Sequence, residues 1–150
     1  MRTFLVSIPF VLSASALCAQ TPVRPSADRV QALLGWVADP SHRAAVLEPH
    51  LPVTWSIVSY PNLMVGKDRI EVTITQDEDV YSVTLHRVTP GPPISIRIAP
   101  GLPLGARVDR ITVNEFDVAV QVEITEHDIH PLTEMLLFTD AVIEFHHSLR

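Results

Sequence analysis

The chain has 150 residues, 47% of them apolar, which is enough for one domain around one hydrophobic core. Its formal net charge is −6 and its Lys and Arg residues form no cluster, which argues against nucleic acid or an anionic membrane surface as a partner. The 13 Pro residues, 5 Gly residues and 19% charged residues favour short strands joined by rigid turns over long helices or disorder.

Residues 1–19 are typical of a secretory signal peptide. Arg2 supplies the positive charge, residues 4–17 are mostly apolar, and small residues surround the expected cleavage after residue 18 or 19. The apolar segment is too short to span a bilayer comfortably, so we expect no transmembrane span in the mature chain. Leu17 before Cys18 argues against a lipoprotein signal, and a buried N-terminal strand or helix is the alternative. We therefore expect an extracytoplasmic protein, periplasmic or secreted, that has no disulfide.

A spacer over residues 20–25 leads into a predicted N-terminal helix over residues 26–39. Ser26 is a suitable N-cap, and four apolar residues follow at helical spacing. These residues are Val30, Leu33, Leu34 and Val37. Pro40 disfavours the helical conformation of the residue before it, so we expect the helix to end at Asp39.

Residues 44–150 are predicted to form a β-sandwich domain, because the apolar period there changes from helical to two. Short turns rich in Pro, Gly and Asp separate the strands, which implies hairpins and antiparallel pairing. About eight short strands predict an all-β, antiparallel two-sheet β-sandwich preceded by one short α-helix. A break in the alternation predicts a β-bulge near Arg110. The clearest strands cover residues 70–75, 81–86 and 94–98, with others at 118–124, 134–138 and 141–147.

Histidine pairs are the first candidates for a metal site. His127 and His130 would share a face on a helix, but Pro131 favours an extended turn, where we interpret them as solvated loop residues. Adjacent His146 and His147 should point to opposite faces of a strand, and we interpret both as structural. The acidic run 77–79 is interpreted as a solvated turn, because no calcium-loop spacing follows it. No metal ligand and no cofactor is predicted.

Carboxylates are the candidates for hydrolytic chemistry. Glu123, Glu126 and Asp128 are close in sequence, but their spacing specifies nothing, and a polar strand edge explains them, with Glu126 and Asp128 in a solvated turn beyond the alternation. No nucleophile motif and no Gly-rich phosphate loop is present. We therefore predict no catalytic residue and no enzymatic activity.

Aromatic side chains are the candidates for sugar binding, since exposed rings stack on pyranose rings. Trp36 lies beside the apolar stripe of the predicted helix and Tyr81 on an apolar strand face, so both are expected in the core. Trp55 and Tyr60 flank Ile57 and remain possible sugar-stacking residues.

Five short runs resemble a known domain in their order and spacing. They cover residues 33–36, 47–52 with Trp55, 62–66, 99–108 and 111–114. Over about residues 30–147 the chain resembles the C-terminal β-sandwich of bacterial (α/α)6-barrel glycoside hydrolases, such as amylo-α-1,6-glucosidase-like and α-L-rhamnosidase-like enzymes. In that family a helical barrel precedes the sandwich and supplies the catalytic carboxylates. No position of this chain matches the catalytic motif, so the resemblance implies a non-catalytic domain.

One residue departs from the family pattern. The family's turn after the strand that ends in Thr-Val-Asn carries Gly, whereas this chain has Glu115. Positive φ strains Glu where it does not strain Gly, so Glu115 argues against a tight two-residue turn.

Three functional hypotheses follow. The first is an exported, non-catalytic accessory or remnant domain of glycoside-hydrolase type that packs against a partner polypeptide through an apolar patch on the N-terminal helix. The patch would comprise Val30, Leu33, Leu34, Trp36 and Val37. The second hypothesis is an independent carbohydrate-binding module that uses Trp55 or Tyr60. A third, more remote hypothesis is a small glycoside hydrolase that uses Glu123 and Glu126.

Overall fold

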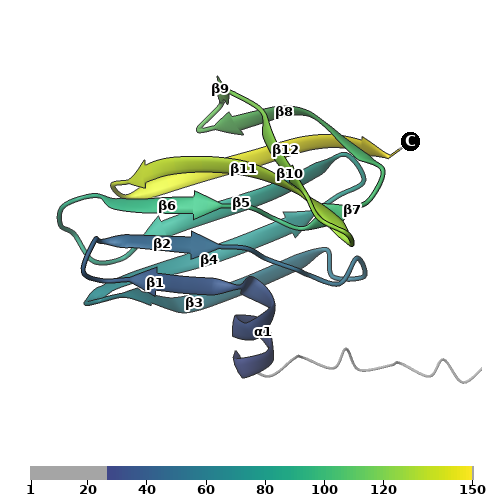
Figure 1. Ribbon diagram of the computed structural model, residues 1–150. Helices are drawn as coiled ribbons and strands as arrows, with labels where there is room; N and C mark the ends of the chain where they lie inside the picture. Colours follow the sequence, from purple (N-terminus) through teal and green to yellow (C-terminus); the bar gives the residue numbers. More distant parts are fainter. Residues whose placement is uncertain (1–26, 150) are drawn as a thin grey trace, which may run out of the picture.

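The computed structural model describes residues 27–149 and places most of them in two β-sheets that lie face to face (Figure 1). The first sheet has the strand order β1-β2-β6-β11-β10, with β7 paired to β11, and the second has the order β3-β4-β5-β12-β8-β9. Among the described strands only β2 and β6 pair in parallel. The prediction of an all-β two-sheet sandwich with one short helix is confirmed.

The described elements have the following bounds: α1 (Ala27–Leu34), β1 (Trp36–Asp39), β2 (Ala44–Leu47), β3 (Ile57–Val65), β4 (Asp68–Gln76), β5 (Val80–Arg87), β6 (Ile94–Ile98), β7 (Leu102–Pro103), β8 (Ala106–Val113), β9 (Phe116–Val118), β10 (Gln121–Ile124), β11 (Asp128–Leu137) and β12 (Asp140–Leu149).

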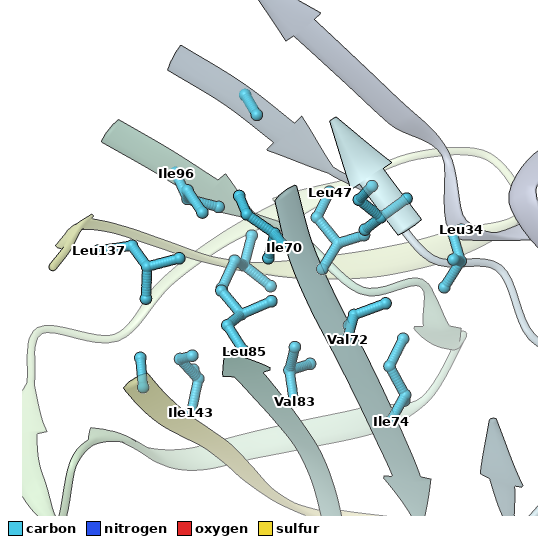
Figure 2. Packing of buried hydrophobic residues seen from close by; sticks show 14 of the residues in the cluster. Leu34, Leu47, Ile70, Val72, Ile74, Val83, Leu85, Ile96, Leu137 and Ile143 are labelled. Atoms are coloured by element: carbon cyan, nitrogen blue, oxygen red, sulfur yellow. The ribbon is translucent and has the colours of Figure 1, made fainter. Parts of the chain in front are cut away.

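The hydrophobic core lies between the two sheets and follows the period-two pattern of the sequence. The alternating apolar residues predicted in β4, β5 and β6 are all buried. Figure 2 shows Ile70 and Leu85 of the second sheet in one cluster with Ile96 and Leu137 of the first, and all four are fully buried. Burying each such side chain contributes about 1.5–3 kcal/mol, so the interior of the sandwich is the main source of stability.

The predicted helix is wrong from residue 35 onward. Helix α1 ends at Leu34, because Gly35 adopts φ = 56°, the left-handed conformation that terminates helices. A Cβ atom on residue 35 would lie 2.4 Å from the carbonyl oxygen of Glu48, so only Gly fits this close approach. The following four residues form β1, which pairs with β2 as an antiparallel hairpin. The stop at Pro40 thus ends a strand instead of a helix.

Two local features of β8 match the sequence pattern in different ways. The bulge predicted near Arg110 is confirmed, because Arg110 pairs with His146 while Val108 pairs with His147, which leaves one extra residue in β8. The tight turn that the sequence argued against is present, since Asn114 and Glu115 alone join β8 to β9 with φ values of 50° and 70°. Glu115 therefore occupies a position that favours Gly.

Arg87, Asp68 and Arg43 form a network of ion pairs and hydrogen bonds that connects the second sheet to the loop between β5 and β6. The side chain of Arg87 is fully buried and donates to Asp68 Oδ1 at 2.7 Å and to the carbonyls of Gly91 and Pro92 at 2.9 and 2.8 Å. Arg43 lies 3.0 Å from the other carboxylate oxygen of Asp68. The hydrogen bond from Arg87, with smaller contributions from Arg43, holds the pKa of Asp68 below its ordinary value.

The predicted signal peptide, the spacer and Ser26 lie outside the described residues. Within residues 27–149 no helix combines the length and the hydropathy needed to cross a membrane.

Candidate functional site

The five residues predicted to face a partner do not form a surface patch. Val30 and Leu34 belong to the core, with exposed fractions of 7% and 0%. Leu33 and Trp36 are half-buried, and the indole of Trp36 packs on the core and donates to the carbonyl of Met64 at 3.2 Å. Only Val37 is exposed, and it lies on a solvent-facing position of β1 and not on α1. The spacing of Val30 and Leu34 on α1 therefore reflects core packing.

The two candidate sugar-stacking residues are both half-buried against the core. Trp55 lies in the loop before β3, where its carbonyl and that of Pro52 accept hydrogen bonds from Gln76. Tyr60 lies on the edge strand β3, and its hydroxyl donates to the side chain of Gln31 at 3.1 Å. Neither ring provides the exposed platform that stacking on a sugar requires.

The three candidate acids are divided between two environments. Glu123 is exposed on β10 and forms an ion pair with Arg97 at 3.0 Å, and Glu126 is exposed in the turn before β11. The expected strand edge is correct for Glu123, and the predicted solvated turn is correct for Glu126. It is wrong for Asp128, which begins β11 and is half-buried.

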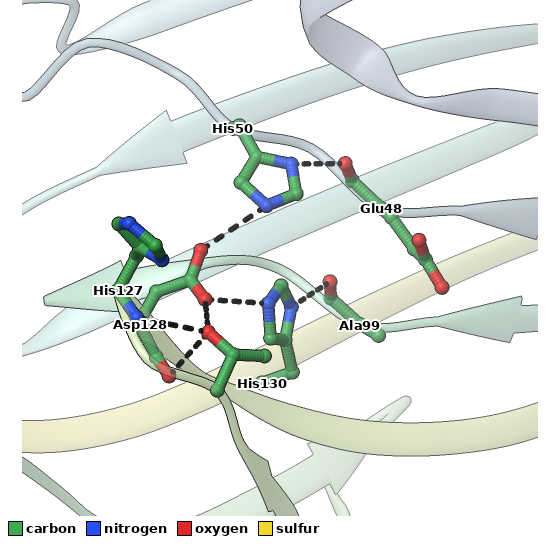
Figure 3. A network of polar contacts seen from close by, with 7 residues as sticks. Glu48, His50, Ala99, His127, Asp128 and His130 are labelled. Carbon is green, nitrogen blue, oxygen red and sulfur yellow. Dashed lines mark hydrogen bonds and ion pairs between the residues drawn. The ribbon is translucent and has the colours of Figure 1, made fainter. Parts of the chain in front are cut away.

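Asp128 lies between two histidines that approach it from different parts of the chain (Figure 3). Nε2 of His50 is 3.2 Å from Oδ2 of Asp128, and Nε2 of His130 is 2.9 Å from Oδ1. On the opposite side of each ring, Nδ1 of His50 lies 2.9 Å from the carbonyl oxygen of Glu48, and Nδ1 of His130 lies 3.1 Å from that of Ala99. We name His50, Asp128 and His130 the end cluster, because they lie at one end of the sandwich.

Backbone hydrogen bonds from two segments position His50. Its own N–H donates to the carbonyl of Leu33 near the end of α1 at 2.8 Å, and the N–H of Gly101 donates to the carbonyl of Pro49 at 3.0 Å. A Cβ atom on residue 101 would lie 2.9 Å from Cδ2 of His50 and 3.1 Å from Oδ2 of Asp128. Gly101 therefore leaves the space in which imidazole and carboxylate meet.

The turn between β10 and β11 positions Asp128. The hydroxyl of Thr125 donates to Oδ1 of Asp128 and accepts from the backbone N–H groups of His127 and Asp128 at 3.2 and 3.1 Å. This hydrogen bond to the carboxylate, followed by the charges of His130 and His50, keeps the pKa of Asp128 below its ordinary value despite partial burial. Asp128 is thus held as an ionised carboxylate with a fixed orientation.

A groove of about 620 Å³ adjoins the end cluster, and His50 and Asp128 line part of it. Tyr81 and His147 line it as well. The hydroxyl of Tyr81 and Nδ1 of His147 are buried and form no hydrogen bond within residues 27–149. Burial raises the pKa of Tyr81 and lowers the pKa of His147, because each charged form loses solvation. Burial therefore favours the neutral form of both side chains.

Part of the end cluster could have been found from the sequence. The interpretation of His127 as a solvated loop residue is correct, but that of His130 is wrong, because His130 is half-buried and hydrogen-bonded at both ring nitrogens. Asp128 and His130 are two residues apart on one strand and therefore share a face. For His50 the sequence carries no local signal, because the fold brings it there from a distant loop.

An exposed apolar row runs through β9 and β10. Between 116 and 124 an apolar residue recurs at every second position, the pattern of a strand with one buried face. The exposed fractions at its two ends are nevertheless 77% for Phe116 and 76% for Ile124, with Val120 and Val122 above 40% and only Val118 half-buried. β9 is the last strand of the second sheet and β10 the last of the first, so the row follows two sheet edges (Figure 1). We name these five residues the edge row.

Comparison with known proteins adds no relative: no protein-family model matches the chain, and neither does any curated protein sequence. The resemblance to glycoside-hydrolase C-terminal domains therefore rests on the sequence motifs alone.

Proposed function

We propose that this chain is an exported, non-catalytic accessory β-sandwich of glycoside-hydrolase type that docks another polypeptide through the edge row. The observation that carries the proposal is the exposure of the apolar alternation between 116 and 124. A strand pattern of this kind normally has its apolar face covered, and here the sandwich itself leaves it uncovered.

The edge row suits a polypeptide in two ways. Burying Phe116 and Ile124 alone would each contribute about 1.5–3 kcal/mol, before the entropic cost of association. The unpaired backbone groups of edge strands β9 and β10 can also accept a strand from a partner. Asp117 and Glu123 alternate with the apolar side chains and so face the other way, where they lie 3.7 Å from Arg110 and 3.0 Å from Arg97, so the partner surface should itself be apolar.

The acids support a role without catalysis. Glycoside hydrolysis needs two carboxyl groups about 5–10 Å apart across a sugar-sized cleft. Glu123 is exposed beside Arg97, and Glu126 is exposed in a turn, so neither is set in a water-excluding site. We expect no turnover of aryl α- and β-glucosides, rhamnosides or α-glucan oligosaccharides. Turnover that a Glu123→Gln/Glu126→Gln double variant loses would contradict the non-catalytic role.

The carbohydrate-binding alternative has less support. Its two candidate rings, Trp55 and Tyr60, are half-buried against the core, and the hydroxyl of Tyr60 is already paired with Gln31.

Site-specific photo-crosslinking in the producing cells tests the docking surface. A benzophenone amino acid at 116 or 124 should give a discrete adduct with another polypeptide, to be identified by mass spectrometry. The same probe at Ile57, an exposed apolar position on edge strand β3, serves as the control. Val120→Lys together with Val122→Lys should abolish the adduct formed at 124. Adducts of equal yield from the Ile57 position, no adduct at all, or only a dimer of this chain would overturn the proposal.

A further inference from the structure

We propose that the end cluster of His50, Asp128 and His130 is a binding site for a divalent transition-metal ion, with Zn²⁺ as the best fit. This inference does not rest on the docking function, because it uses different residues, although β10 of the edge row pairs with β11 beside His130.

The hydrogen-bond partners determine which ring nitrogen each histidine presents. A carbonyl oxygen only accepts hydrogen bonds, so Nδ1 of His50, beside Glu48, and Nδ1 of His130, beside Ala99, must carry the hydrogen. Nε2 of each ring points to Asp128, whose oxygens only accept, so a hydrogen on Nε2 or a metal ion must lie between nitrogen and oxygen at each contact. A divalent metal ion takes the place of these two hydrogens and binds the two Nε2 lone pairs and the carboxylate together.

The same arrangement is found around protein-bound zinc. A metal-ligating histidine almost always donates its other ring N–H to a carboxylate, a backbone carbonyl or water, which fixes both its tautomer and its orientation. Here both histidines already have such partners in the carbonyls of Glu48 and Ala99, at 2.9 and 3.1 Å.

The distances suit a small ion. The three ligand atoms lie within 4.8 Å of one another, and the two N–O separations are 3.2 and 2.9 Å. Ligand atoms about 2.0–2.1 Å from a tetrahedral Zn²⁺ lie roughly 3.4 Å apart, so small side-chain rotations open the site. His50 has a half-exposed side chain, at 52%, and can make that adjustment.

The donor set selects the kind of metal. Two imidazoles and one carboxylate suit Zn²⁺, Cu²⁺ or Ni²⁺, whereas Ca²⁺ and Mg²⁺ prefer oxygen ligands alone. Three protein ligands leave a fourth tetrahedral position open, and His50 and Asp128 line the groove from which water or a ligand would fill it. The bound ion would link the loop after β2 to β11.

Zinc titration of the full chain, purified without a polyhistidine tag and treated with a chelator, tests this site. Isothermal titration calorimetry should show one Zn²⁺ per chain with a Kd below about 10 μM. His50→Gln and Asp128→Asn should each weaken binding by at least about tenfold. His127→Gln is the matched control, because His127 is exposed in the same turn and lies outside the cluster, and it should bind as the wild type does.

Cobalt substitution gives a second measurement, which reports the coordination geometry of the bound ion. Co²⁺ bound to the wild type and to His127→Gln should give the intense visible absorption of a tetrahedral site, which His50→Gln should lose. His50 is exposed enough for His50→Gln to fold, and circular dichroism checks that it does. Absence of 1:1 zinc binding by the wild type, or equal binding by the folded His50→Gln, would overturn the proposal.

Discussion

Asp68 and Asp128 are each a carboxylate placed between two basic side chains, in two different parts of the sandwich. The carboxylate of Asp68 pairs with Arg87 and Arg43 at 2.7 and 3.0 Å, and its exposed fraction is 9%. The carboxylate of Asp128 faces His130 and His50 at 2.9 and 3.2 Å, and its exposed fraction is 19%. The distances are thus similar at the two sites, whereas Asp68 is more deeply buried and the basic partners differ.

The identity of those partners separates structure from chemistry. A guanidinium has only donors and stays protonated, so the network around Asp68 is a permanent ion cluster that holds the second sheet and the β5–β6 loop together. An imidazole can present a lone pair, so the groups around Asp128 can exchange a proton for a metal ion. The buried site should therefore govern stability and the end cluster should govern binding.

Replacing Arg87 should have the largest effect. Arg87→Met leaves Asp68 buried with a single partner and should lower the free energy of unfolding by about 3–5 kcal/mol, as for other broken buried pairs. Urea denaturation at pH 7 measures this. Arg69→Met is the control, because Arg69 lies 3.7 Å from Glu71 at exposed positions and should cost less than about 1 kcal/mol. Equal losses from the two variants would mean that the buried network around Asp68 contributes no more to stability than an exposed ion pair does.

Gly91 and Gly101 each lie beside one of the two carboxylate sites, so replacing each with Ala compares how much added volume the two sites tolerate. A Cβ on Gly91 would lie 2.7 Å from the terminal nitrogen of the fully buried Arg87, and φ = 158° adds strain, so Gly91→Ala should cost about 2–3 kcal/mol. A Cβ on Gly101 would meet His50, which can rotate into solvent, so Gly101→Ala should cost only about 1 kcal/mol. Thermal denaturation of both variants measures the two losses of stability. A larger loss from Gly101→Ala would show that the end cluster is the more rigid of the two.

Acid should weaken the two sites unequally. Asp68 has a lowered pKa in the folded state, so its contribution to stability is present above about pH 4, the unfolded value, and is lost as pH falls through the folded value. Asp68→Asn should therefore flatten the decrease of unfolding free energy below pH 4. Asp128→Asn should flatten it less, because Asp128 is more exposed and pairs with histidines. Urea denaturation between pH 2 and 5 makes the test, and an equal change in slope would contradict it.

The smallest expected effect comes from a backbone change remote from both carboxylates. It gives a reference value for the larger changes in unfolding free energy. Glu115 has φ = 70°, so Glu115→Gly should raise the unfolding free energy by about 0.5–1 kcal/mol through relief of strain. Asn tolerates positive φ, so Asn114→Gly should change little. Chemical denaturation measures both variants. An unchanged or lower midpoint for Glu115→Gly would mean that side-chain contacts of Glu115 offset the strain.

The sequence predicts the sandwich well because each strand carries its own pattern. The alternation in β4, β5 and β6 needs only local information, and so does the bulge beside Arg110. The apolar spacing continues past Gly35 and predicts a helix that is too long, whereas the left-handed conformation of Gly35 ends it at Leu34. The pairing of β1 with β2 then depends on contacts with the rest of the first sheet.

The end cluster was less accessible, because its members come from separate elements. The strand neighbours Asp128 and His130 share a face, which spacing alone could have indicated. His50 joins them through the hydrogen bonds of residues 49–50 with Leu33 and Gly101, which no local pattern encodes. The edge row differs from its prediction in another way. The alternation predicts one strand over 118–124, whereas the structure divides it between β9 and β10 in different sheets, and alternation does not say whether a face is covered.

The place of β12 has a consequence for how the molecule reaches its fold. β12 is the last strand described along the chain, yet it lies between β5 and β8 in the middle of the second sheet. Residues 80–87 and 106–113 therefore cannot form one continuous sheet until 140–149 insert between them. Such pairing across long stretches of chain is intrinsically slow, in the range of milliseconds to seconds for β-sandwiches. Until then two apolar strand edges stay open, and folding competes with aggregation during that interval.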